Sequence, residues 1–92
     1  MSATAASTLS DQELAGLAAA RVIDARGVGC PGPLLEAKKG MGTVAVGSVI
    51  EVWSSDPVTK TDIGAWSTKV GHEFLGALAA DGYDRVFVRR GK

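Results

Sequence analysis

The chain has 92 residues, and its ten basic and ten acidic residues give no formal net charge. This length suffices for one compact domain. The balanced charge offers no general attraction to nucleic acid or a membrane surface, and no apolar run reaches the roughly 18–20 residues that a membrane span needs. With one cysteine and no basic, apolar leader, the chain is expected in the reducing cytoplasm.

Residues 1–20 are predicted to be an N-terminal extension, and residues 21–92 to form the domain. The first residues are small and polar. Ser10 with Glu13 three residues later fits a capping box. A short helix that reaches about Ala20 is therefore one interpretation of the extension, and a disordered segment is the other.

The remaining pattern predicts four strands and two helices. Short apolar runs bounded by turn residues predict strands, and apolar residues at helical spacing predict helices. In chain order the predicted elements are a strand at Arg21–Ala25, a helix from Pro31 to about Met41, a strand at Val49–Ser54, a helix from near Pro57 or Thr59 to about Val70, and strands at 73–79 and 85–90. Residues 81–84 supply the turn of a hairpin.

The order β-α-β-α-β-β predicts a two-layer α/β fold of the α+β type. A strand–helix–strand unit implies a right-handed crossover between parallel strands, whereas the terminal hairpin is antiparallel. We therefore expect a mixed four-stranded sheet with both helices packed on one face.

The only cysteine lies among glycines and prolines, in the segment Gly27-Val28-Gly29-Cys30-Pro31-Gly32-Pro33. Proline is accepted in the first turn of a helix, so Pro31 and Pro33 predict a helix start here with Cys30 at its N-cap. The partial positive charge of a helix N-terminus favours a thiolate over a thiol. Gly29 and Gly32 leave the sulfur flanked by residues without side chains, which gives a partner's active site room to close over it.

An inert core position is the structural alternative for Cys30, because a lone cysteine often packs as a small apolar residue. A glycine-rich turn is a poor place to bury a thiol, which favours the reactive interpretation. We expect no metal site, since Cys30 and His72 are the only soft or imidazole ligands, and no cofactor. Thioredoxin-type exchange is not expected either, because no second thiol is present.

These motifs resemble the TusA (SirA-like) family of sulfur carriers from about Ile23 to Arg90. The matching segments are Asp24-Ala25-Arg26-Gly27, the Cys30-Pro31-Gly32-Pro33 signature, Gly47, Ser55-Asp56-Pro57, Thr59-Lys60-Thr61-Asp62-Ile63, Gly71-His72-Glu73 and Val86-Phe87-Val88. The resemblance implies the same two-layer fold and a sulfane sulfur carried as a persulfide on Cys30. It also implies that the sulfur passes from a donor protein to an acceptor protein.

The resemblance also implies classes of partner. The donor would be a cysteine desulfurase or a rhodanese-like protein. In one branch of the family the sulfur reaches 2-thiouridine of tRNA, and in another it feeds sulfur oxidation through DsrE-like or heterodisulfide-reductase-like proteins. Gly29 and Gly32 stand where the tRNA-linked members carry a charged residue and Glu, which argues against that branch. The helix segment Leu34-Leu35-Glu36-Ala37-Lys38-Lys39 is more similar to variants found in sulfur oxidisers.

The sequence therefore predicts a sulfurtransferase-type persulfide carrier that acts with partner enzymes and binds neither membrane nor nucleic acid directly. Cys30 is the predicted covalent group, positioned by Gly29, Pro31, Gly32 and Pro33. The predicted docking charges are Arg26, Lys38 and Lys39. The competing hypothesis is a non-catalytic regulatory module that binds protein or RNA and whose cysteine is incidental. A third is a redox sensor that forms a disulfide between two chains.

Overall fold

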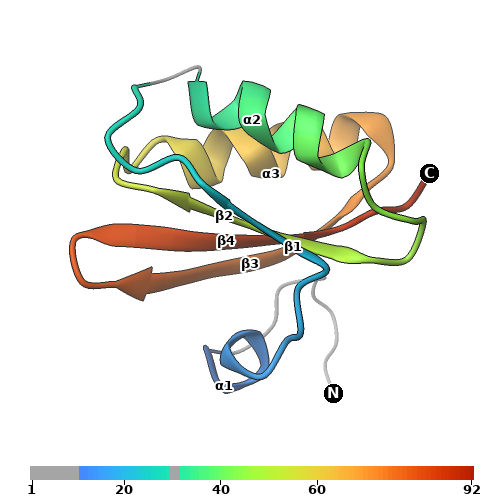
Figure 1. Cartoon of the computed structure of the whole chain (residues 1–92), viewed down its shortest axis with the longest axis horizontal. Helices are drawn as coiled ribbons and strands as arrows, with labels where there is room; N and C mark the ends of the chain where they lie inside the picture. The colour runs from blue at the N-terminus through green and yellow to red at the C-terminus, as the bar shows by residue number, and fades with distance from the viewer. Residues whose placement is uncertain (1–10, 30–31) are drawn as a thin grey trace.

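The computed structural model describes residues 11–29 and 32–92, which form a four-stranded sheet with two helices on one face and a short helix on the other (Figure 1). The elements are α1 (Asp11–Ala15), β1 (Arg21–Asp24), α2 (Gly32–Met41), β2 (Val49–Ser54), α3 (Thr59–Val70), β3 (Glu73–Ala80) and β4 (Tyr83–Arg89). After α1, the order is the predicted β-α-β-α-β-β. None of the helices in the described ranges is long and apolar enough to cross a bilayer.

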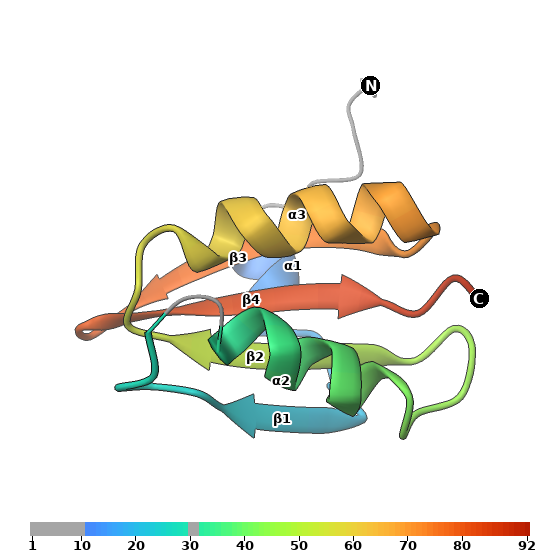
Figure 2. The ribbon, with the colours of Figure 1, turned by 90° about the horizontal axis from the view of Figure 1, so that it is seen from above.

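The sheet has the strand order β1-β2-β4-β3, with β1 and β2 parallel and β4 antiparallel to both its neighbours. Viewed from above, α2 lies over β1 and β2, and α3 lies over β4 and β3 (Figure 2). Between these layers is the main core, built around Ala37, Met41, Ile50, Val52, Ile63, Val86 and Val88. The predicted mixed sheet with two helices on one face is confirmed.

The β3–β4 turn is tighter than the sequence pattern predicts. Ala80 pairs with Tyr83, so only Asp81 and Gly82 connect the strands, and the expected turn over residues 81–84 is wrong by two residues. Gly82 has a φ of 83°. Asp-Gly is a preferred pair for a two-residue hairpin because both turn positions adopt positive φ, and this lets β4 begin at Tyr83.

The short helix α1 covers part of the opposite sheet face. Its residue Leu14 is 1% exposed and packs with Val49, Leu75 and Phe87 in a second hydrophobic cluster. Of the two interpretations of residues 11–20, the structure has a helix, which ends at Ala15 rather than near Ala20. The chain then straightens, and the Ala20 N–H donates to the carbonyl of Val49 at 2.8 Å.

Candidate functional site

The loop that follows β1 leads to the start of α2, at the end of the molecule where the β3–β4 turn also lies (Figures 1 and 2). Parallel strands β1 and β2 both point their carboxyl ends toward this loop, a common location for sites in α/β proteins. Cys30 and Pro31, two of the predicted site residues, lie outside the described residues. The site is therefore defined by its two flanks, residues 25–29 and the start of α2.

The first flank is anchored to the end of β2. Ala25 is buried, and its N–H donates to the carbonyl of Trp53 at 2.9 Å. The Gly27 N–H donates to Ser55 Oγ at 2.9 Å. Gly27 has a φ of 80°, a conformation that residues with a side chain rarely adopt. The chain therefore enters the cysteine segment from a fixed position.

Arg26 forms two interactions that hold its side chain against the sheet. Its Nε and one terminal nitrogen donate to the two carboxylate oxygens of Asp24 at 2.8 and 2.7 Å. Its guanidinium carbon lies 4.8 Å from the ring centre of Trp53 and 4.9 Å from that of Tyr83, within the range of cation–π attraction. The hydrogen bonds from Arg26 lower the pKa of Asp24 to about 2. The Arg26 side chain thus pairs with Asp24 and lies over two aromatic rings while part of it stays exposed to solvent.

The second flank begins with Gly32, whose N–H donates to the carbonyl of Gly29 at 2.8 Å. A Cβ atom on Gly32 would overlap Val28 Cγ1, whereas a Cβ on Gly29 would meet nothing within 4 Å. Contact with Val28 therefore explains the glycine at position 32. No contact with a described residue explains the glycine at position 29. Pro33, the next predicted positioning residue, is buried at the start of α2.

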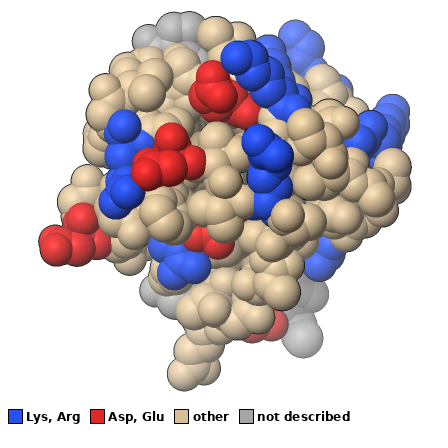
Figure 3. Space-filling view, in the orientation of Figure 1, with Lys and Arg blue, Asp and Glu red and all other residues tan. Residues whose placement is uncertain are grey.

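The exposed face of α2 combines an apolar residue with the two lysines predicted to dock partners. Leu35 is 50% exposed, and Lys38 and Lys39 follow within the next turn. Lys39 Nζ lies 3.5 Å from Glu36 Oε2, whereas Lys38 makes no hydrogen bond or ion pair with any described residue. On the face shown in Figure 3, basic side chains predominate toward the end of the molecule where α2 ends, whereas acidic and basic ones lie side by side toward the β3–β4 turn.

Beside this site lies a polar network that sequence reasoning missed. Glu51 is 4% exposed, and its Oε2 accepts hydrogen bonds from Trp53 Nε1 at 2.5 Å and Arg85 Nε at 2.6 Å. Trp53 in turn contacts Arg26 and Tyr83. Glu51 and Trp53 are two positions apart in β2, and this spacing predicts that their side chains lie on the same face of the sheet. The partners on β4 depend on strand register, which the sequence does not reveal.

His72 is separate from this site. It precedes β3, and its Nδ1 accepts a hydrogen bond from the Gly91 N–H at 3.0 Å. Its ring lies edge-on to Trp66. Within the described ranges, no three His, Cys, Asp or Glu side chains gather into a group that could hold a metal ion.

Comparison with known proteins identifies the family. Residues 21–90 match the family of sulfurtransferase TusA. A protein of Archaeoglobus fulgidus named as a candidate sulfur carrier is 45% identical over 69 residues, which cover 75% of this chain and 94% of that protein. The sulfur carrier protein TusA of Pseudomonas entomophila is 34% identical over 68 residues, covering 74% of this chain and 85% of the relative.

A solved structure has the same fold. The crystal structure of a SirA-like protein from Desulfitobacterium hafniense matches with a TM-score of 0.69 and 26% identity, covering 78% of this chain and 99% of the other. The family match extends over all four strands and over both helices that cover the main core. The chain therefore belongs to the family of sulfurtransferase TusA.

Proposed function

We propose that this protein is a sulfur carrier that holds sulfane sulfur as a persulfide on Cys30 and passes it to a partner protein. The observation that carries this proposal is the family match over residues 21–90, which includes the Cys-Pro-x-Pro signature around the only cysteine. The names of the relatives support it, since they describe sulfur carriers.

The transfer has two steps, and both conserve the oxidation state of the sulfur that moves. The Cys30 thiolate attacks the outer sulfur of a donor persulfide, the donor thiolate leaves, and Cys30 becomes a persulfide. An acceptor thiolate then attacks the outer sulfur of that persulfide, and the Cys30 thiolate leaves. Because the chain has no second cysteine, no internal thiol can expel the sulfur, and both steps are intermolecular.

The described flanks support this chemistry. The anchored loop and the helix start at Gly32 bracket the cysteine segment, and the helix N-terminus favours a thiolate or persulfide anion beside it. Gly29 is exposed and has open space around it, so a partner can approach the chain closely there. Pro31 completes the proposed positioning set with Gly29, Gly32 and Pro33.

Partner recognition is proposed to use Arg26, in the loop before the cysteine, and two lysines in the last turn of α2. Lys38 and Lys39 are exposed on α2 and available to an acidic partner surface, while Arg26 adds a charge already paired with Asp24. We propose a cysteine desulfurase or rhodanese-like donor in the cytoplasm. The proposed acceptor is a DsrE-like or heterodisulfide-reductase-like protein, with transfer toward tRNA thiolation as the other route.

Mass spectrometry tests the carrier function directly. After incubation with polysulfide, the intact protein should gain about 32 Da per sulfur, with every adduct on the Cys30 peptide and removed by dithiothreitol. Cys30→Ser should abolish the adduct and keep the wild-type circular dichroism spectrum, because no disulfide is lost. A wild-type protein that never gains sulfur, or a serine variant that does, would contradict the proposal.

A further inference from the structure

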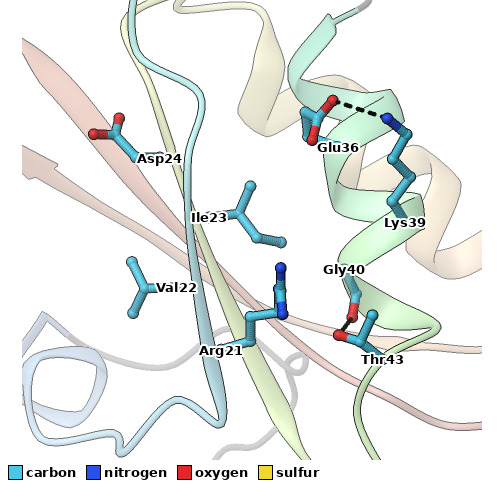
Figure 4. Close-up of a pocket in the computed structure, with 8 residues that line it drawn as sticks. All are labelled: Arg21, Val22, Ile23, Asp24, Glu36, Lys39, Gly40 and Thr43. Carbon is cyan, nitrogen blue, oxygen red and sulfur yellow. Dashed lines mark hydrogen bonds and ion pairs between the residues drawn. The ribbon is translucent and has the colours of Figure 1, made fainter.

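A cavity of about 280 Å³ lies between β1 and α2 (Figure 4). It is lined by Arg21, Val22, Ile23, Asp24, Glu36, Lys39, Gly40 and Thr43. Successive residues of a strand point to opposite faces, so all four residues of β1 line one cavity only if it follows the edge of the strand. The other wall comes from positions 36, 39 and 40 of α2, whose spacing is that of one helix face, and from Thr43 just beyond the helix. The cavity is thus a groove between a strand edge and a helix, which we name the β1–α2 groove.

The strand edge in this groove is open to a further strand. Among the described residues, β1 pairs only with β2 and is an edge strand of the sheet. Just after the end of β1, the Ala25 N–H points to β2, where it donates to Trp53. Because backbone groups alternate in direction along a strand, the N–H and C=O groups of Val22 and Asp24 point away from β2, into the groove. Gly40 keeps the helix close, since a Cβ there would overlap Ile23 Cδ1.

One of the charged side chains that line the groove has no partner of opposite charge among the described residues. Asp24 is bound by Arg26, and Glu36 lies near Lys39. The side chain of Arg21 forms no hydrogen bond or ion pair within the described part of the chain, and Figure 4 shows it extending from β1 toward α2. The opposite edge strand, β3, offers no such contrast, since its only charged residue, Glu73, is paired with Arg89.

We propose that the β1–α2 groove binds an extended acidic segment of a partner protein, which adds to the edge of β1 and places a carboxylate on Arg21. Strand addition supplies affinity through backbone hydrogen bonds, and the side chains in the groove supply selectivity. The inference rests on the proposed function in assigning this segment to a sulfur donor or acceptor. β1 ends at Asp24, where the anchored loop to Cys30 begins, so a segment on β1 would hold its partner beside the cysteine segment.

A titration followed by amide chemical shifts tests the groove on the full chain. The probe is a capped heptapeptide of alternating Glu and Val, and the matched control is the same peptide with Lys in place of Glu. We expect the acidic peptide to shift the amide signals of Val22, Asp24 and Gly40 in the low millimolar range, and the basic peptide to leave them unchanged. Arg21→Glu should weaken binding by about fivefold or more at low salt, as expected for the loss of a surface ion pair.

Lys69→Glu is the control variant, because Lys69 is an exposed cation on α3 without a described partner. It should bind the acidic peptide as the wild type does. The proposal is overturned if the acidic peptide at about 5 mM, where a millimolar site would be occupied, shifts none of these amides, if both peptides shift them equally, or if Arg21→Glu binds like the wild type. Loading of Cys30 by polysulfide, measured on the same samples, separates the two proposals: its failure would refute the carrier function and leave the peptide result standing.

Discussion

At the scale of single residues, two glycines that flank the cysteine segment differ in what they do. Gly32 is required to leave room for Val28, whereas Gly29 has open space around it and a backbone that does not demand glycine. The absence of a side chain at position 29 thus serves no contact among the described residues. We attribute it to the close approach of a partner to Cys30.

Substitution separates these two roles. Gly29→Ala should change the free energy of unfolding by less than about 0.5 kcal/mol, as for other unconstrained surface positions, yet slow sulfur transfer to a protein acceptor. Gly32→Ala should destabilise the domain, and adding Val28→Ala should recover about 1 kcal/mol by removing the overlapping methyl group. Urea unfolding of the three variants measures their stabilities, and the rate of sulfur transfer to a protein acceptor measures the effect of Gly29→Ala. Equal stability of Gly32→Ala with Val28 and with Val28→Ala would contradict the overlap.

Arg26 controls the ionisation of Asp24. Replacing Arg26 with Gln should raise the pKa of Asp24 from about 2 toward its ordinary value near 3.9, because the charged hydrogen bonds that stabilise the carboxylate are weakened. Carboxyl carbon chemical shifts followed from pH 1.5 to 6 give this pKa directly. A carboxylate with a depressed pKa stabilises the fold above its unfolded pKa, and this stabilisation is lost as the pH falls through about 2. An unchanged pKa in the variant would show that Arg26 is not its cause.

At the scale of elements, His72 links the turn after α3 to the C-terminal residues. Burial lowers the pKa of His72, with Arg90 and Lys92 adding to the effect, and the neutral ring accepts the hydrogen bond from Gly91. The unfolded chain therefore binds a proton at a higher pH than the folded one. Stability from this residue should be complete above about pH 6.5 and should fall as the pH drops through the folded pKa. His72→Gln should flatten this part of the stability–pH curve measured by urea unfolding.

The start of α2 yields a prediction about the thiol. If Cys30 lies in the field of this helix N-terminus, its pKa should be below the ordinary value of about 8.5. The pH dependence of iodoacetamide alkylation measures it, with Cys30 as the only thiol in the chain. A value at or above about 8.5 would remove the helix from the mechanism and leave the carrier function to the mass measurement.

The elements show which features a single sequence reveals. The alternation in Val49–Ser54 predicted a strand correctly, and residues 81–84 predicted a hairpin whose turn is two residues shorter than expected. In both segments the local chemistry favours the same structure as the fold does. The N-terminal helix could not be decided, since a helix of five residues is unstable alone and depends on the burial of Leu14. Likewise, only the register of Asp24 beside Trp53 brings Arg26 to its aromatic contacts.

At the scale of the whole molecule, α1 is an addition to the region that the family match covers. The match begins at residue 21, and α1 precedes it. Leu14→Ala should cost about 2–4 kcal/mol of unfolding free energy, because the side chain is buried against Val49, Leu75 and Phe87. Ala18→Gly, at an exposed position of the same segment, is the control and should have little effect. A wild-type unfolding midpoint for Leu14→Ala would show that α1 does not stabilise the domain.

The position of β4 in the sheet has a consequence for motion. Val86, Phe87 and Val88 are consecutive and fully buried, because β4 has a hydrophobic cluster on each of its faces. β1, by contrast, is an edge strand of four residues, three of them exposed. Amide hydrogens of β4 should therefore exchange with solvent only when the whole domain unfolds, while those of β1 exchange through local opening. The edge strand β1, which leads into the cysteine loop, can then adjust to successive partners while the central strand β4 stays folded.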